Sequence, residues 1–252
     1  MLIIGIDLAW GDRKSDGVCF LEAGHRDAAV SGYAYPRGDD ELLRELSPRV
    51  SASAEVLVTI DAPLVLPNVT GTRPVDRLTH RLFHREHAAC HPANLTKCPR
   101  PPRVLERLSR LGIQPGWEVH KGMKTAAEVY PHPAMIRMFR LPRIIKYKKG
   151  SVEARRKEFR RLQRCIRKSL RELFPALKLD RETTKLLKAP WNKPTEDRVD
   201  SLFCALIGLW HWKHRGKRSE VIGNLETGFI LLPEDLRSET AVQSGKQGGK
   251  KA

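Results

Sequence analysis

Two apolar runs of this sequence each end in an aspartate. Residues 2–6 (LIIGI) precede Asp7, and residues 56–60 (VLVTI) precede Asp61. Such runs predict buried β-strands. An ionised carboxylate in apolar surroundings is costly unless it is paired or bound to a cation. A shared metal ion is one chemical reason to place an aspartate at both positions.

Three further acids follow the same logic. Residues 125–130 predict another strand, which contains Glu128 and stops at a proline. Asp197 and Asp200 lie at i and i+3 on one face of an expected helix with Thr195 as its N-cap. Hard cations such as Mg²⁺ take oxygen ligands and bridge carboxylates to substrate phosphates. The candidate ligands of Mg²⁺ or Mn²⁺ are Asp7, Asp61, Asp197 and Asp200, and Glu128 is a fifth candidate catalytic residue.

Each acid also has a structural explanation. Acids near a helix N-terminus gain about 0.3–1 kcal/mol from the macrodipole without any catalytic role, which would account for Asp197 and Asp200. Asp61 precedes Ala-Pro and would then cap a turn, although a turn does not explain Asp7. Glu128 is as suited to pairing with an arginine as to binding a metal. These alternatives stay open at the level of sequence.

The charge balance points to a polyanionic partner. The 252 residues carry a formal net charge of +17, which attracts phosphates and supports salt-sensitive binding to DNA or RNA. The segment 140–175 is the most basic, and residues 140–168 hold thirteen Lys and Arg against two Glu. Solubility or a solvated helix face is the alternative explanation. The candidate nucleic-acid contacts in this segment are Lys148, Lys149, Arg156, Arg160, Arg164 and Arg167.

Arg73 is a further candidate contact. It lies three residues before Asp76, so it either clamps a phosphate with both guanidinium nitrogens or pairs with that aspartate.

Histidines and cysteines gather between residues 80 and 98. Structural zinc sites show two tight ligand pairs, and here only His80 with His84, and His87 with Cys90, resemble such pairs. Zinc is therefore not favoured, and the preferred interpretation is a basic helix whose histidines face solvent or phosphate.

The elements that position these residues form one domain over residues 1–237. The pattern predicts β-β-β-α-β over residues 2–60, a proline-rich and partly helical insertion over 62–118, and the basic helical segment 140–175 before the last helix. A short strand at 228–233 closes the fold, and the tail 238–252 is too polar to order itself. The five cysteines are scattered and odd in number, which indicates a reduced, cytoplasmic chain. The longest apolar stretch, 202–212, is too short to cross a membrane, which takes about 20 residues.

The motifs resemble those of the DUF429 family, predicted nucleases of the ribonuclease H-like fold. The resemblance rests on Gly-Ile-Asp at 5–7, Ile-Asp-Ala-Pro at 60–63, Glu-Val-Tyr-Pro-His-Pro at 128–133 and Asp-x-x-Asp-Ser-Leu-x-x-Ala at 197–205, in that order. It implies an α/β fold with a mixed five-stranded sheet flanked by helices.

The resemblance also implies a role for each acid. Asp7 matches the strand-one acid, Asp61 the strand-four acid, and Asp197 with Asp200 the acids of the last helix, which also resemble those of RuvC-type resolvases. Glu128 matches an acid typical of DUF429. Two metal ions held by such acids activate a water for attack on a phosphodiester.

The expected function is therefore metal-dependent hydrolysis of nucleic acid. A nucleic-acid-binding protein that keeps the fold without cleavage is the alternative. An actin-like ATP-dependent kinase also begins with an aspartate strand, but residues 8–13 and 62–64 lack the glycine-rich backbone that cradles phosphates.

Overall fold

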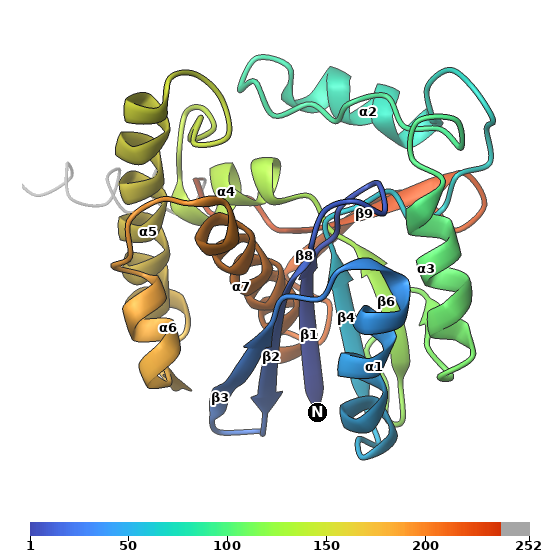
Figure 1. Cartoon of the computed structure of the whole chain (residues 1–252), viewed down its shortest axis with the longest axis horizontal. Coiled ribbons are helices and arrows are strands. Elements are labelled where there is room, and N and C mark those ends of the chain that lie inside the picture. Colours follow the sequence, from blue (N-terminus) through green and yellow to red (C-terminus); the bar gives the residue numbers. More distant parts are fainter. Residues whose placement is uncertain (238–252) are drawn as a thin grey trace, which may run out of the picture.

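A mixed sheet of seven strands forms the centre of the computed structural model, which describes residues 1–237 (Figure 1). The strand order is β5-β6-β4-β1-β2-β3-β7. The strands are β1 (Leu2–Asp7), β2 (Gly17–Ala23), β3 (Ala28–Ala34), β4 (Val56–Ile60), β5 (Gln114–Pro115), β6 (Lys124–Glu128) and β7 (Leu177–Lys178).

Strand direction brings three of the predicted acids to one edge of the sheet. β1 pairs antiparallel with β2 and parallel with β4, and β4 pairs parallel with β6. In this register Ile6 lies opposite Ile60, and Ile60 lies opposite Glu128. Because parallel strands end at the same edge, Asp7, Asp61 and Glu128 follow one another along it.

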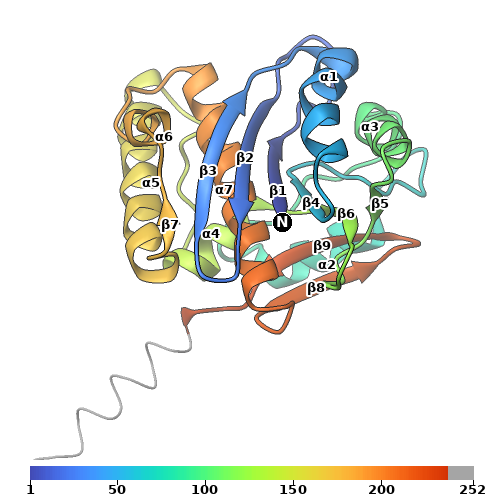
Figure 2. The same cartoon turned by 90° about the horizontal axis from the view of Figure 1, so that it is seen from below.

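Helices cover both faces of the sheet, which explains why its central strands are apolar throughout. The helices are α1 (Gly38–Ser51), α2 (Pro74–Phe83), α3 (Arg100–Ser109), α4 (Pro131–Phe139), α5 (Val152–Leu173), α6 (Arg181–Leu186) and α7 (Lys193–Lys213). Figure 2 shows α1 and α3 on one face, α7 on the other, and α5 with α6 outside α7.

Two glycines let α7 lie directly against the sheet. A Cβ on Gly5 would come within 2.1 Å of the Ser201 carbonyl oxygen, and one on Gly17 within 2.1 Å of the Asp197 carbonyl oxygen. Any side chain at either position would push the helix away. The glycine of the Gly-Ile-Asp motif therefore brings the acids of α7 close to Asp7.

The sheet differs from the five strands expected from sequence. β5 and β7 contain two residues each, too few to show a periodic pattern, and they extend the sheet at both ends. The strand expected at 228–233 is β9 (Gly228–Pro233), which pairs with β8 (Ser219–Asn224) in a separate two-stranded sheet. The tail 238–252 lies outside the described residues.

The start of the last helix also differs from the prediction. α7 begins at Lys193, and its N-cap is Asn192, whose side-chain oxygen accepts from the Thr195 amide at 2.8 Å. Asparagine and threonine are both common N-cap residues. The sequence therefore did not distinguish Asn192 from Thr195 as the residue before the first turn of α7.

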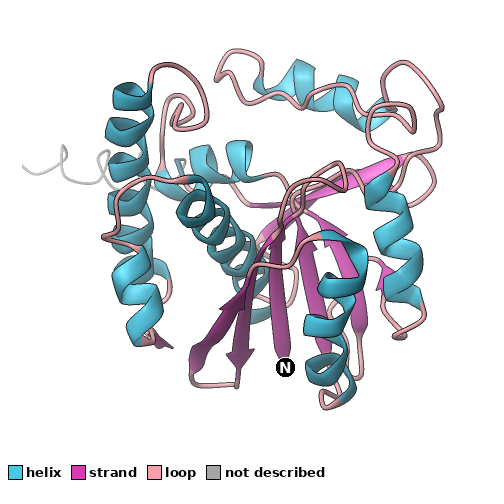
Figure 3. Ribbon diagram, in the orientation of Figure 1, coloured by secondary structure: helices cyan, strands magenta, loops and turns pink. Residues whose placement is uncertain are grey.

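The two irregular segments are only partly helical. Residues 62–118 contain α2, α3 and β5, joined by loops (Figure 3). Helix α5 occupies residues 152–173 of the basic segment 140–175, after a Ser151 N-cap. Among the described residues, no helix has the length and apolar character needed to span a membrane.

Candidate functional site

Four carboxylates converge where β1 and β4 end beside α7. Asp7 ends β1, Asp61 follows β4, and Asp197 and Asp200 belong to α7; these four residues are called the acid cluster below. Burial raises the pKa of Asp61 to about 8, and the negative charges of Asp7 and Asp200 add to the effect. Burial also raises the pKa of Asp7, with a further contribution from Asp200. Asp7, Asp61 and Asp200 are therefore close enough for the charge of one carboxylate to raise the pKa of another.

A lysine side chain lies among these carboxylates. Lys148 Nζ is 2.8 Å from Asp200 Oδ2 and 3.8 Å from Asp7 Oδ1. Burial lowers the pKa of Lys148, but the charges of Asp200 and Asp7 outweigh it and hold this pKa well above its usual value. Tyr147 donates its hydroxyl to Asp200 Oδ1 at 2.7 Å. Asp200, which is 0% exposed, is thus held on both oxygens by consecutive residues.

Asp197 is held from the other side of the cluster. Lys193 Nζ lies 2.7 Å from Asp197 Oδ1, and Tyr35 donates to Asp197 Oδ2 at 2.8 Å. Burial and the charge of Asp7 raise the pKa of Asp197 to about 6. Because α7 starts at Lys193, Asp197 and Asp200 lie beyond its first turn, where the macrodipole effect has faded. The helix N-terminus therefore does not explain these two acids.

The acid cluster is not arranged as a complete metal ligand set in this conformation. Within residues 1–237, no three His, Cys, Asp or Glu side chains come together closely enough to hold a metal ion. The positive charges in contact with the cluster are the ammonium groups of Lys148 and Lys193.

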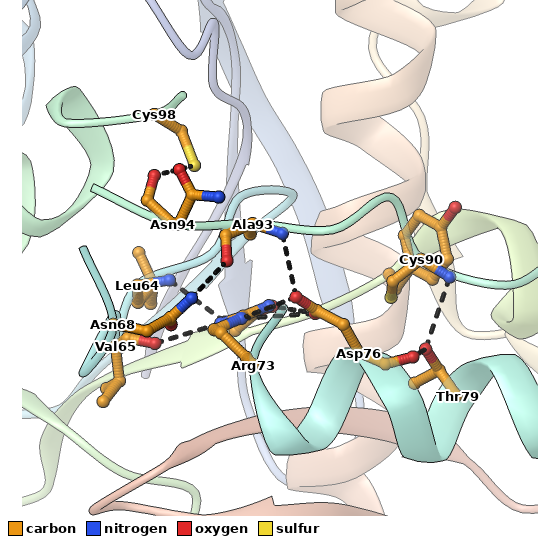
Figure 4. Close-up of polar contacts among 12 residues, drawn as sticks. Leu64, Val65, Asn68, Arg73, Asp76, Thr79, Cys90, Ala93, Asn94 and Cys98 are labelled. Carbon is orange, nitrogen blue, oxygen red and sulfur yellow. Dashed lines mark hydrogen bonds and ion pairs between the residues drawn. The ribbon is translucent and has the colours of Figure 1, made fainter. Parts of the chain in front are cut away.

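Glu128 forms an ion pair with an arginine, which is one of the two roles that the sequence allowed for it. Arg73 Nη2 lies 2.7 Å from Glu128 Oε1, and Arg73 Nη1 donates to Glu128 Oε2 at 2.9 Å. The same guanidinium contacts Asp76, with Nη2 2.8 Å from Oδ1 (Figure 4). Arg73 is 1% exposed, so it has no surface to offer a nucleic acid. Arg73 therefore pairs with Asp76 and does not face a phosphate-binding surface.

This buried triad fixes the chain that follows Asp61. Glu128 Oε2 accepts from the Leu64 amide at 3.0 Å, and Arg73 Nη1 donates to the Val65 carbonyl at 3.1 Å. Both bonds hold residues just after the aspartate (Figure 4). Glu128 and Arg73 thus position the Asp61 segment.

Comparison with known proteins identifies the family of the chain. The family described as "Protein of unknown function (DUF429)" matches residues 5–227. The chain belongs to the DUF429 family. The matched range contains the acid cluster, Lys148 and the Arg73–Glu128 pair. Among curated proteins, none matches the chain.

One buried ion pair of this DUF429 chain was missed at the level of sequence. Asp16 and Arg100 are both 0% exposed, with Arg100 Nη2 2.6 Å from Asp16 Oδ2. Asp16 Oδ1 accepts from the Ala9 amide at 2.9 Å, and Arg100 Nη1 donates to the Ala9 carbonyl at 2.8 Å. The pair therefore fixes the chain that follows Asp7. The sequence pattern did not identify Asp16 as buried, because this residue lies in a polar segment typical of a turn.

The basic helix of the DUF429 chain presents its arginines as expected from the pattern. Phe159, Leu162 and Ile166 are buried, whereas Arg156, Arg160 and Arg164 are exposed and Arg167 is half-buried. None of these four arginines forms an ion pair with a described acid. Of the two lysines predicted with them, Lys149 is exposed, but Lys148 is engaged by the acid cluster.

Proposed function

We propose that this protein is a nuclease of the ribonuclease H-like fold that hydrolyses phosphodiester bonds at the acid cluster. The observation that carries the proposal is the convergence of Asp7, Asp61 and Asp200 from two central strands and one helix, with Asp197 beside them. Buried, mutually repelling carboxylates destabilise a fold and are typical of functional sites. The strand order β6-β4-β1-β2-β3, with only β2 antiparallel to its neighbours among these strands, agrees with the fold that the family resemblance implies.

The chemical type of the possible ligands, carboxylate oxygens, is the type that a hard divalent cation prefers. All candidate ligands are carboxylate oxygens. Burial is the largest cause of the raised pKa values of Asp7, Asp61 and Asp197, and a bound cation would offset it by stabilising the ionised carboxylates. Mg²⁺ or Mn²⁺ held by the acid cluster would supply the charge that acidifies a water and stabilises the leaving oxygen. Lys148 would leave Asp7 and Asp200 to the cation and donate to the substrate phosphate.

The surrounding residues keep the carboxylates in place. Tyr147 orients Asp200, and Tyr35 with Lys193 orients Asp197. Glu128 fixes the segment after Asp61, and Asp16 fixes the segment after Asp7. The exposed arginines of α5 supply an electrostatic attraction for the nucleic-acid backbone.

Cleavage assays with single-stranded, duplex and branched DNA and with RNA test the proposal. We expect Mg²⁺- or Mn²⁺-dependent cleavage of at least one substrate, abolished by EDTA and reduced at least 100-fold in Asp7→Asn. Asparagine keeps the shape of the side chain, so circular dichroism should show an intact fold. Undiminished cleavage by folded Asp7→Asn would refute the assignment.

A second function, nucleic-acid binding without cleavage, is favoured by one observation. The Lys148 ammonium already neutralises Asp200 and Asp7, and a protein that has given up its metal would need such a charge. Tight, salt-sensitive binding without turnover in Mg²⁺ or Mn²⁺ would select this alternative.

A further inference from the structure

A cavity of about 290 Å³ with a basic lining lies next to the acid cluster. Its walls come from α2 and the turn after it, from the start of α4, and from the segment 144–149 that leads to α5. Five histidines and three lysines line it, and no acid does. In Figure 1 α2 lies beyond the edge of the sheet where β1 and β4 end.

Shared residues connect this cavity to the acid cluster. Lys148 lines the cavity, and its ammonium pairs with Asp200 and Asp7. His91 and Tyr130 line the cavity and also a small hollow of about 50 Å³ that reaches Asp61. A group bound in the cavity would therefore lie next to the carboxylates.

Two of the three lysines of the lining lack a counterion within the described part of the chain. Lys146 and Lys149 are exposed at the cavity and form no ion pair with a described acid. Burial, together with the charges of Lys148, His91 and Lys149, lowers the pKa of His132 to about 3, so the innermost imidazole is neutral. Its Nδ1 lies 3.0 Å from the Tyr130 hydroxyl.

The histidines of the lining do not make a metal centre. No group of three potential ligands is close enough to hold a metal among residues 1–237. His80 and His84 instead stack, with ring centroids 5.7 Å apart. A cavity with several cations, polar imidazoles and no carboxylate suits an anion.

We infer that this cavity binds a phosphate group of a nucleic-acid strand, next to the phosphodiester that the acid cluster cleaves. The inference rests on the proposed function for the identity of the strand. The volume lies at the small end of ligand pockets, about 300–1,000 Å³, which suits one phosphate with part of its nucleotide. Lys146 and Lys149 hold the phosphate, while the exposed arginines of α5 contact the strand farther along.

Binding measured in EDTA separates this site from catalysis. Fluorescence anisotropy with a labelled single-stranded oligonucleotide would compare the wild type with the double variant Lys146→Gln/Lys149→Gln. The control, Lys121→Gln/Lys185→Gln, removes the same charge from exposed lysines of the β5–β6 connection and α6. We expect the cavity variant to bind at least 10-fold more weakly and the control to change less than 3-fold.

Inorganic phosphate provides a second, strand-free probe. At matched ionic strength, phosphate should raise the melting temperature of the wild type and control relative to chloride, and should not raise that of the cavity variant. Oligonucleotides with and without terminal phosphates distinguish an end phosphate from an internal one, since only an end-binding cavity prefers the phosphorylated form.

Equal losses of affinity in the two double variants would overturn the inference, because net charge alone would explain them. Unchanged affinity in the cavity variant, with no phosphate effect in any protein, would also overturn it. Absence of cleavage in Mg²⁺ would refute the proposed nuclease and leave these binding results intact.

Discussion

Lys148 places its ammonium 2.8 Å from the buried carboxylate of Asp200. Asp200 is wholly buried, and a buried carboxylate without a partner costs several kcal/mol. Lys148 lies in the loop before α5, and Asp200 lies on α7. The pair thus joins the basic segment to the acid cluster, and it supplies the positive charge that a divalent cation would otherwise bring.

Replacing this lysine should make the protein dependent on divalent cations. Lys148→Met keeps the aliphatic stem and removes the ammonium, so in EDTA the variant should lose about 3–5 kcal/mol of unfolding free energy. Mn²⁺ should restore much of this loss, because the cation replaces the missing charge. Urea unfolding with and without Mn²⁺ measures both effects.

Lys149→Met is the matched control, because Lys149 is the exposed neighbour and makes no ion pair with a described acid. It should retain the wild-type unfolding free energy and Mn²⁺ response. If Mn²⁺ stabilised neither Lys148→Met nor the wild type, the acid cluster would not be a cation site.

Asp61 should make the metal-free protein less stable as the pH rises. Its pKa is about 8 in the folded state against about 3.9 in an unfolded chain. Between these values the folded state keeps a proton that the unfolded state has released, so stability is lost as pH rises through this window. His132, with a folded pKa of about 3, acts in the opposite direction, but only below its unfolded pKa of about 6.5.

Asp61→Asn tests this between pH 6.5 and 8 in EDTA. One proton can contribute a slope of up to about 1.4 kcal/mol per pH unit. The wild type should lose unfolding free energy across this range, and the variant should lose less and be the more stable protein at pH 8. An identical slope in both proteins would contradict the assigned pKa shift.

The sequence predicted the acid cluster because its members carry local signals. Asp7 and Asp61 end apolar runs, and Asp197 with Asp200 share a helix face. The family resemblance implied a mixed sheet flanked by helices, and the parallel pairing of β1 with β4, which brings these signals together, comes from the structure. The two-residue strands β5 and β7 were missed because their pairing depends on tertiary contacts.

The partners of the acids were not predictable in the same way. Any of the 46 Lys and Arg residues can neutralise an acid, and sequence spacing does not distinguish a solvated lysine from Lys148. Arg73 pairs with Glu128 over 55 positions, and Arg100 pairs with Asp16 over 84 positions. Only the folded chain brings such residues together.

Glu128 should support the site without binding the cation. Glu128→Gln removes the charge opposite Arg73 but keeps a carbonyl oxygen for the Leu64 amide. The variant should therefore be destabilised by about 3–5 kcal/mol, as expected when a buried ion pair loses one partner. Isothermal titration with Mn²⁺ should still show binding by the folded variant, whereas Asp61→Asn should weaken it at least 10-fold. Equal weakening in both would make Glu128 a ligand.

The Asp16–Arg100 pair should control the segment after Asp7. Asp16→Asn leaves the buried Arg100 guanidinium with Asp39, whose Oδ1 lies 2.8 Å from Arg100 Nε, as its remaining carboxylate. A loss of about 3 kcal/mol in unfolding free energy is expected. Arg103→Met is the control, because this arginine also contacts Asp39 but lies at the exposed surface. Exposed pairs contribute about 0–1 kcal/mol, so a loss in Arg103→Met as large as that in Asp16→Asn would contradict the special role of the buried pair.

The exposed arginines of α5 should contribute to the salt dependence of nucleic-acid binding. The triple reversal Arg156→Glu, Arg160→Glu and Arg164→Glu removes up to three phosphate contacts, and each contributes about 0.7–0.9 to the slope of log K against log salt. We expect affinity for DNA to fall and the slope to decrease by about 2–3.

The control reverses three exposed charges away from α5: Arg26→Glu, Arg44→Glu and Lys121→Glu. Both triple variants have the same net charge, so a general attraction for the polyanion predicts equal losses in affinity and slope. A strand that follows α5 predicts a large loss for the α5 variant alone, because counterion release depends on the cations that contact phosphates. Binding that survived reversal on α5 would exclude this helix from the nucleic-acid surface, and the basic cavity beside Lys148 would then be the remaining candidate.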